Sequence, residues 1–206
     1  MSKETAEIIQ GAVILVPFLV LVVGASKVLA AFTNARFNQS LTPLIPVIGG
    51  TLRSDGIHGV MTGTYRGKEV GVQATTGTRS LQFPGHSEQK RNLFTIEINE
   101  VGGAGDWRFA HGTEALFGRN HWHLRADDEG VKERLDSHSV IAAIEGMGNI
   151  PVIHYSASQK RLTYIEDIAP SLAPSPERFQ SQLDLLEHLA KINEQVSAAG
   201  LSSPAL

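Results

Sequence analysis

The longest hydrophobic segment of the chain lies near its start, where Ile8–Ser26 has the sequence IIQGAVILVPFLVLVVGAS and carries no charged side chain. At a helical rise of about 1.5 Å per residue, this segment is long enough to cross a hydrocarbon core about 30 Å thick. Hydrophobic residues surround the whole helix and leave no polar stripe for water, which argues against a helix at the surface of a globular core. The pattern predicts a transmembrane helix.

A cleaved secretory signal is the alternative interpretation of this segment. Such signals place an apolar region of about 7 to 15 residues behind a basic leader. Here the leader MSKETAE is of mixed charge, the apolar run is longer, and only Val23–Ala25 offers small residues for cleavage. We therefore expect residues 1–32 to remain as leader and membrane anchor, in contact with membrane lipid.

Three residues inside the segment favour packing against a second helix. Gly11 and Gly24 would let a neighbouring backbone approach closely. Pro17 removes one backbone donor, which bilayer helices tolerate better than soluble helices do. Other membrane-protein subunits are thus the expected partners of Gly11, Pro17 and Gly24.

The charges that flank the segment bear on its orientation. Lys27 and Arg36 follow it with no acidic residue before Asp55, whereas the leader carries both signs. Because basic flanks tend to stay in the cytoplasm, this difference favours a cytoplasmic domain. The difference is small, and a periplasmic domain is the open alternative.

The chain after the anchor divides into a linker, a domain and a tail. Thr33–Gly50 is first polar and then apolar, and it carries Pro43 and Pro46, which predicts a semi-extended linker rather than a helix. Residues 51–196 have the length of one domain. Residues 197–206 are expected to form a loose tail.

Alternating apolar and polar residues predict antiparallel strands in this domain. The clearest hairpin lies within residues 57–77 and turns at Arg66–Lys68, where Gly67 can supply a positive φ. Further strands are predicted over residues 92–99, 120–126, 151–156 and 161–166, and an exposed loop over residues 78–91.

Three helices are predicted among and after these strands, over residues 128–136, 139–145 and from 176 onward. Asp127 is the expected N-cap of the first, and Gly146 is expected to end the second in a left-handed conformation. Ser175 and Pro176 mark the start of the third. Its apolar stripe is typical of a core face and would equally suit docking on a partner: Phe179, Leu183, Leu186 and Ala190.

These elements together indicate the fold class. Turns rather than helices join the early strands, which disfavours parallel βαβ winding. The predicted fold is α+β, with a single N-terminal transmembrane helix followed by a mainly antiparallel sheet, or a partly open barrel, and two or three helices.

Composition excludes several kinds of chemistry. The chain has no cysteine, and therefore no disulfide, thiolate nucleophile or thiolate metal site. A formal net charge of −3 with scattered basic residues does not favour nucleic-acid binding. The glycine cluster at residues 101–105 is not followed by a helical pattern, as a phosphate-binding loop would be. Ser137–Ser139 carries no nucleophile elbow, and the acidic run at residues 127–129 suits helix capping better than catalysis.

Two histidines are the strongest candidates for a metal site. His121 and His123 lie two residues apart on a predicted strand, so they would share one face, and His111 could add a third ligand. Alternation explains the same pattern without a metal, with both histidines toward solvent and Trp122 and Leu124 inward. We therefore assign no metal and no cofactor.

The sequence favours a non-catalytic accessory or scaffolding subunit of a larger, bacterial membrane complex. One alternative is a membrane-tethered, metal-dependent enzyme or sensor that uses His111, His121 and His123. A second alternative is a domain that binds a small ligand in a β-lined pocket near Trp107 and Trp122.

Overall fold

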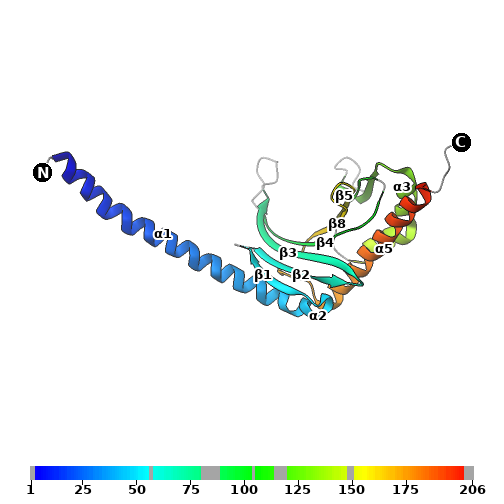
Figure 1. Cartoon of the computed structure of the whole chain (residues 1–206), viewed down its shortest axis with the longest axis horizontal. Helices are drawn as coiled ribbons and strands as arrows, with labels where there is room; N and C mark the ends of the chain where they lie inside the picture. Colours follow the sequence, from blue (N-terminus) through cyan, green and yellow to red (C-terminus); the bar gives the residue numbers. More distant parts are fainter. Residues whose placement is uncertain are drawn as a thin grey trace.

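A long N-terminal helix projects from an antiparallel sheet in the computed structural model, which describes residues 3–55, 58–79, 89–103, 105–113, 120–147 and 151–201 (Figure 1). The helices are α1 (Lys3–Leu41), the short 3-10 helix η1 (Thr42–Leu44), α2 (Ile45–Ile48), α3 (Glu129–Leu135), α4 (His138–Glu145) and α5 (Pro176–Leu201). The strands are β1 (Thr51–Asp55), β2 (His58–Tyr65), β3 (Lys68–Arg79), β4 (Gln89–Ile98), β5 (Trp107–Thr113), β6 (Asn120–Ala126), β7 (Val152–Ser156) and β8 (Arg161–Asp167).

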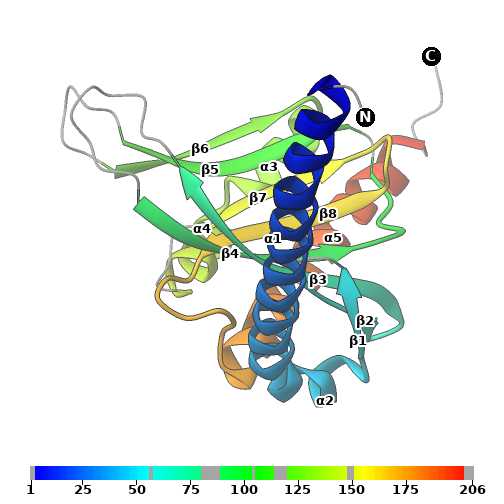
Figure 2. The same ribbon diagram turned by 90° about the vertical axis from the view of Figure 1, so that its left-hand side faces the viewer.

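The eight strands form one open sheet in the order β1-β2-β3-β4-β8-β7-β5-β6 (Figure 2). Every pairing is antiparallel. The predicted α+β class with one N-terminal apolar helix is confirmed, and of the two predicted arrangements the chain adopts the sheet rather than the barrel. β1 and β6 are its edges.

The hydrophobic core lies on one face of this sheet. In β4, Phe94, Ile96 and Ile98 are buried, as the alternation of the sequence predicted. The stripe of α5 covers this face, so Phe179, Leu183 and Leu186 belong to the core and are not on the surface that a partner would meet. The opposite face of the sheet carries half-buried and exposed residues.

The helix that contains the predicted span, α1, continues without a break to Leu41. η1 and α2 follow at once, so the expected semi-extended conformation of Thr33–Gly50 is wrong. Pro43 and Pro46 each lie in the first turn of a helix, where a missing N–H breaks no helical hydrogen bond. The prolines therefore start helical turns here instead of ending them.

The end of α1 is part of the domain core. Phe37, Leu41, Leu44 and Ile48 recur at helical spacing and are all buried. Gly59 in β2 permits this close packing, because a Cβ there would lie 2.6 Å from the Phe37 Cβ. α1 is thus joined to the sheet by side-chain packing and not by a flexible segment.

Both predicted hairpins are present. β2 and β3 are joined through Arg66 and Gly67, whose φ values of 48° and 84° form the tight turn expected from the glycine. β7 and β8 pair across Ala157–Lys160. β6 has the predicted bounds.

Several local predictions differ from the structure. Asp128, not Asp127, caps α3, because its Oδ1 accepts a hydrogen bond of 2.9 Å from the Val131 N–H. Gly146 has a right-handed φ of −63°, so the left-handed cap predicted for α4 is wrong. β1 and β5 had no predicted counterpart. Within the predicted loop over residues 78–91, residues 78–79 belong to β3, residues 89–91 belong to β4, and residues 80–88 lie outside the described part. The first residues of the predicted loose tail are helical, because α5 continues to Leu201.

α5 begins as the sequence predicted, with the Ser175 Oγ accepting a hydrogen bond of 3.3 Å from the Arg178 N–H. Its first turns are held on β8 by a buried carboxylate. Glu166 accepts hydrogen bonds from Arg178 at 2.8 Å, Tyr164 at 3.0 Å and Gln182 at 2.5 Å. Burial, with the adjacent Glu166 charge, raises the pKa of the Tyr164 phenol, which stays a donor. This network fixes the helix over the sheet.

Candidate functional site

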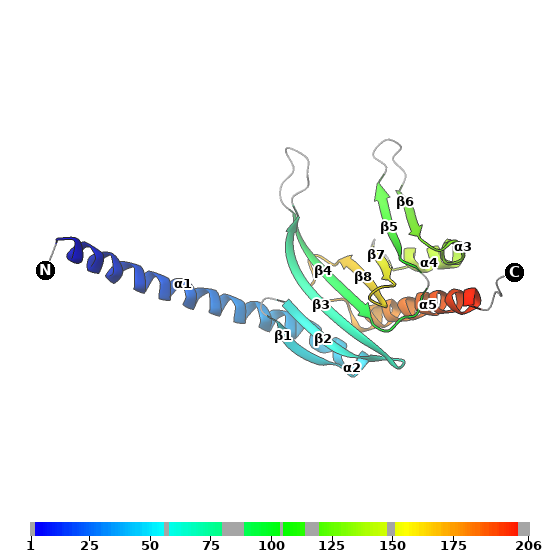
Figure 3. The same cartoon turned by 45° about the horizontal axis from the view of Figure 1, so that its top comes forward.

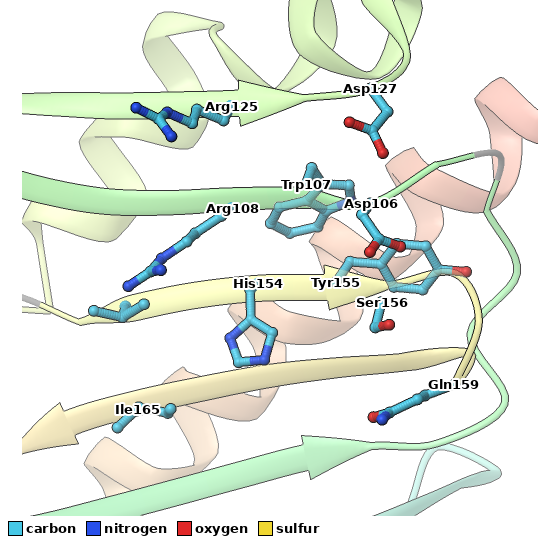
Figure 4. A pocket seen from close by; sticks show the side chains of 11 residues that line it. Asp106, Trp107, Arg108, Arg125, Asp127, His154, Tyr155, Ser156, Gln159 and Ile165 are labelled. Atoms are coloured by element: carbon cyan, nitrogen blue, oxygen red, sulfur yellow. The ribbon is translucent and has the colours of Figure 1, made fainter.

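A shallow groove of about 540 Å³ lies on the open face of the sheet, over β5, β6, β7 and β8 (Figure 4). Its lining comes from these four strands and the turns at their ends. The residues are Asp106, Trp107, Arg108, Arg125, Asp127, Val152, His154, Tyr155, Ser156, Gln159 and Ile165. The volume is in the range of sites that hold small molecules.

Strand register brings three nitrogen-bearing side chains into one row across this groove. Arg108 of β5 pairs with Arg125 of β6 on one side and with His154 of β7 on the other. Directly opposed residues of an antiparallel pair share a face, with Cβ atoms about 4.5–5.5 Å apart. Trp107 and Tyr155 alternate with this row and are buried on the core side.

The arginines of this row have no charge partner within the part of the chain that the structure describes. No carboxylate there lies within ion-pair distance of Arg108 or Arg125. Burial, followed by the positive charge of Arg108, lowers the pKa of the His154 imidazole from its usual value. Like charges opposite one another destabilise a sheet, so the row carries an uncompensated cost.

Carboxylates occupy the other end of the groove. Figure 4 shows Asp106 and Asp127 beyond Trp107, with Ser156 and Gln159 nearby and the Arg108 side chain extending away from them. Asp106 accepts a hydrogen bond of 2.7 Å from the Ala157 N–H. The groove therefore has a cationic part and an acidic, hydroxyl- and amide-bearing part.

The floor of the groove is tied to α5. The Trp107 Nε1–H donates to the Asn193 Oδ1 at 3.0 Å, and the Asn193 Nδ2 donates to the Gly102 carbonyl at 2.6 Å. The Tyr155 hydroxyl donates to the Val101 carbonyl at 2.9 Å, and its ring stacks on Trp107 with centroids 6.3 Å apart. These bonds fix the start of β5, and so the position of Arg108.

The three sequence-predicted histidines lie on the paired strands β5 and β6, where the register gives their backbone positions. His111 pairs with Trp122, whereas His121 and His123 pair with Gly112 and Ala110. His111 therefore alternates with the other two along the ladder instead of standing opposite either of them. The side chains of all three histidines lie outside the described residues. Among the His, Asp and Glu side chains that are described, no group of three lies close enough together to hold a metal ion.

The other candidates from the sequence are placed as follows. Asp128 caps α3, and Ser137 and Ser139 hydrogen-bond to each other at 3.1 Å. Trp107 borders the groove but its side chain is buried on the core side, and the side chain of Trp122 lies outside the described part. Sequence reasoning missed Arg108, Arg125 and His154, although the alternation of Trp107 and Phe109 with Arg108 was a usable signal for a strand.

α1 forms a second surface of interest. Within the described residues, one helical segment is long and apolar enough to cross a membrane, and it runs from Val20 to Ile48. Seven of its large hydrophobic side chains are 46% to 71% exposed: Val20, Leu21, Val22, Val23, Val28, Leu29 and Phe32. A Cβ at Gly24 would meet nothing within 4 Å, and the surroundings of Gly11 and Pro17 lie outside the described side chains.

The geometry of the groove and of α1 is thus the basis for any functional argument about this chain. No protein-family model, curated protein or solved structure matches it.

Proposed function

We propose that this chain is a non-catalytic accessory or scaffolding subunit of a larger membrane protein complex, held in the bilayer by α1. One observation carries the proposal: α1 runs without a break from its exposed apolar part to residues buried in the domain, Phe37 and Leu41. A subunit built in this way holds its domain at a fixed place beside the membrane.

The exposed apolar part of α1 needs a cover other than water. Burying a side chain such as leucine or valine is favourable by about 1.5–3 kcal/mol, and the helix displays seven large apolar side chains between Val20 and Phe32. Lipid and neighbouring transmembrane helices both supply such a cover. Gly24 keeps one side of the helix open for close approach of another backbone.

The distance between the apolar part and the domain is short. From Phe32 to Leu41 the helix rises only about 14 Å, at about 1.5 Å per residue. Lys27 and Arg36 then lie close to the lipid headgroups, and their charges favour a cytoplasmic domain. The non-catalytic part of the proposal rests on the sequence, which lacks a thiolate and a nucleophile elbow.

Co-purification tests this proposal. The full chain is extracted from native membranes in a mild detergent, and the proteins that travel with it are identified and counted by mass spectrometry. We expect a partner in fixed proportion. A single, monodisperse chain without any partner would contradict the proposal.

Two alternative insertions between Phe32 and Thr33 test whether assembly requires a rigid connection between α1 and the domain. Seven alanines extend the helix by about 10 Å with nearly unchanged facing, and seven Gly/Ser residues of equal length break it. We expect the alanine variant to retain more partner than the Gly/Ser variant. Equal retention would show that rigid attachment does not matter for assembly.

The groove favours a second candidate, a domain that binds a small ligand. This role is compatible with a scaffolding subunit, because the groove and the α1 surface occupy different parts of the chain. It predicts saturable binding by the isolated full-length chain, without any partner protein.

A further inference from the structure

We propose that the groove binds a small, soluble phosphate ester, whose phosphate is held by Arg108, Arg125 and His154. This inference does not depend on the scaffolding role. It follows from the charge, the shape and the position of the groove.

The positive charge of Arg108 and Arg125 favours an anionic ligand. Arg108 stands directly between Arg125 and His154 in the sheet, and in the described part of the chain neither arginine has a carboxylate within ion-pair distance. Arg161 of β8, on the same face of the sheet, is by contrast paired with Glu97 at 3.3 Å. A dianion at the centre of the row would compensate the repulsion that the free sheet bears.

The shape of the guanidinium groups and the volume of the groove favour a small phosphate ester. The guanidinium group presents a planar fork of donors that matches two oxygens of a phosphate, and two neighbouring forks can bind three or more oxygens. A volume of about 540 Å³ leaves room beside the phosphate for the rest of a small molecule. A polymer or a protein segment is not needed to fill it.

The rest of the ligand would meet the acidic end of the groove. Asp106 and Asp127 accept hydrogen bonds from hydroxyl or ammonium groups, and Ser156 and Gln159 add neutral partners. Val152 and Ile165 provide a small apolar surface on the other side of His154. A phosphorylated sugar or amino compound carries a phosphate at one end and hydroxyl or ammonium groups at the other, as this groove requires.

Position argues for a soluble ligand over a lipid headgroup. α1 packs on β2, next to the β1 edge of the sheet, whereas Arg108 lies on β5, five strand positions away from β2 (Figure 3). At about 4.8 Å per strand, this separation is about 24 Å. The groove thus lies at the end of the domain remote from α1.

Calorimetric titration of the full-length chain in detergent tests the proposal, with inorganic phosphate and glycerol 3-phosphate as probes at constant ionic strength. We expect saturable binding of both probes, with glycerol 3-phosphate about threefold tighter because its hydroxyls reach the acidic end. Arg108→Gln and Arg125→Gln should each weaken binding about tenfold or more. Arg108→Lys keeps the charge but loses the fork, and should give an intermediate affinity.

Arg134→Gln is the matched control, because this arginine is exposed on α3 and lies outside the groove. It should leave phosphate affinity unchanged. Thermal unfolding separates binding from folding: removal of one like charge should leave the midpoint of Arg125→Gln unchanged or higher. Affinity equal to that of the wild type in both glutamine variants, or no saturable binding by the wild type, would overturn the proposal.

Nanodiscs separate the two sources of phosphate. With α1 in discs of phosphatidylcholine alone or with added anionic lipid, we expect the same affinity for glycerol 3-phosphate. Competition by the anionic lipid would overturn the assignment to a soluble ligand.

Discussion

At the scale of single residues, the contact between α2 and β2 depends on the absence of a side chain. A Cβ at Gly63 would lie 2.5 Å from the Ile48 carbonyl oxygen, closer than any real contact. Gly71 lies on the neighbouring strand β3 and on the open face of the sheet. A Cβ there has room, because its nearest neighbour would be Glu97 at 3.9 Å. The two glycines offer a matched comparison.

Gly63→Ala should destabilise the protein by about 1–3 kcal/mol, since the added methyl group forces α2 away from β2. Gly71→Ala should change stability by no more than about 0.5–1 kcal/mol, and in the stabilising direction, because alanine loses less conformational freedom on folding. Chemical unfolding of both variants in the same detergent measures the difference. Equal effects would mean that α2 does not pack on β2 as closely as described.

The sequence revealed some of these single-residue roles and not others. Gly67 was predictable, because a turn between two β-rich runs needs positive φ at a nearby position. Gly63 was not, since its neighbour Ile48 comes from another element. Arg108 and His154 were not paired either, because β5 and β7 become neighbours only through contacts distant along the chain.

At the scale of elements, the structure depends on how helices attach to the sheet. Local signals predicted both hairpins and the start of α5, because turns and helix caps depend on residues that are adjacent in the sequence. The same local signals failed at α2, where Pro43 and Pro46 suggested a break. The buried stripe that includes Phe37 and Leu41 continues through both prolines and was the stronger signal.

The attachment of α5 to β8 makes a prediction at this scale. Arg178→Met should destabilise the protein by about 2–3 kcal/mol, because Glu166, which is 2% exposed, would lose its cationic partner. Lys132→Met is the control, since its ion pair with Glu129 is exposed and should contribute little to stability. Unfolding at pH 8 compares the two.

A loss of stability in Arg178→Met no larger than that in Lys132→Met would contradict the role given to Glu166.

At the scale of the whole molecule, the two surfaces with a proposed role lie at opposite ends of the sheet. α1 packs beside the β1 edge, whereas β5 and β6 form the other end of the sheet (Figures 2 and 3). Arg108 and Arg125 of the groove lie on these two strands. A rigid connection between them would hold the groove at a fixed height above the bilayer. The sequence predicted the long apolar N-terminal helix and the α+β domain, and it missed this connection because it treated Thr33–Gly50 as a linker.

The distance between α1 and the domain tests this account most directly. Because the chain has no cysteine, two spin labels can be placed without removing any native residue, at Lys27→Cys on α1 and Glu133→Cys on α3, both exposed positions. Double electron–electron resonance in nanodiscs should give one narrow distance distribution, which broadens when seven Gly/Ser residues are inserted after Phe32. A broad distribution for the chain without the insertion would contradict rigid attachment of the domain to α1.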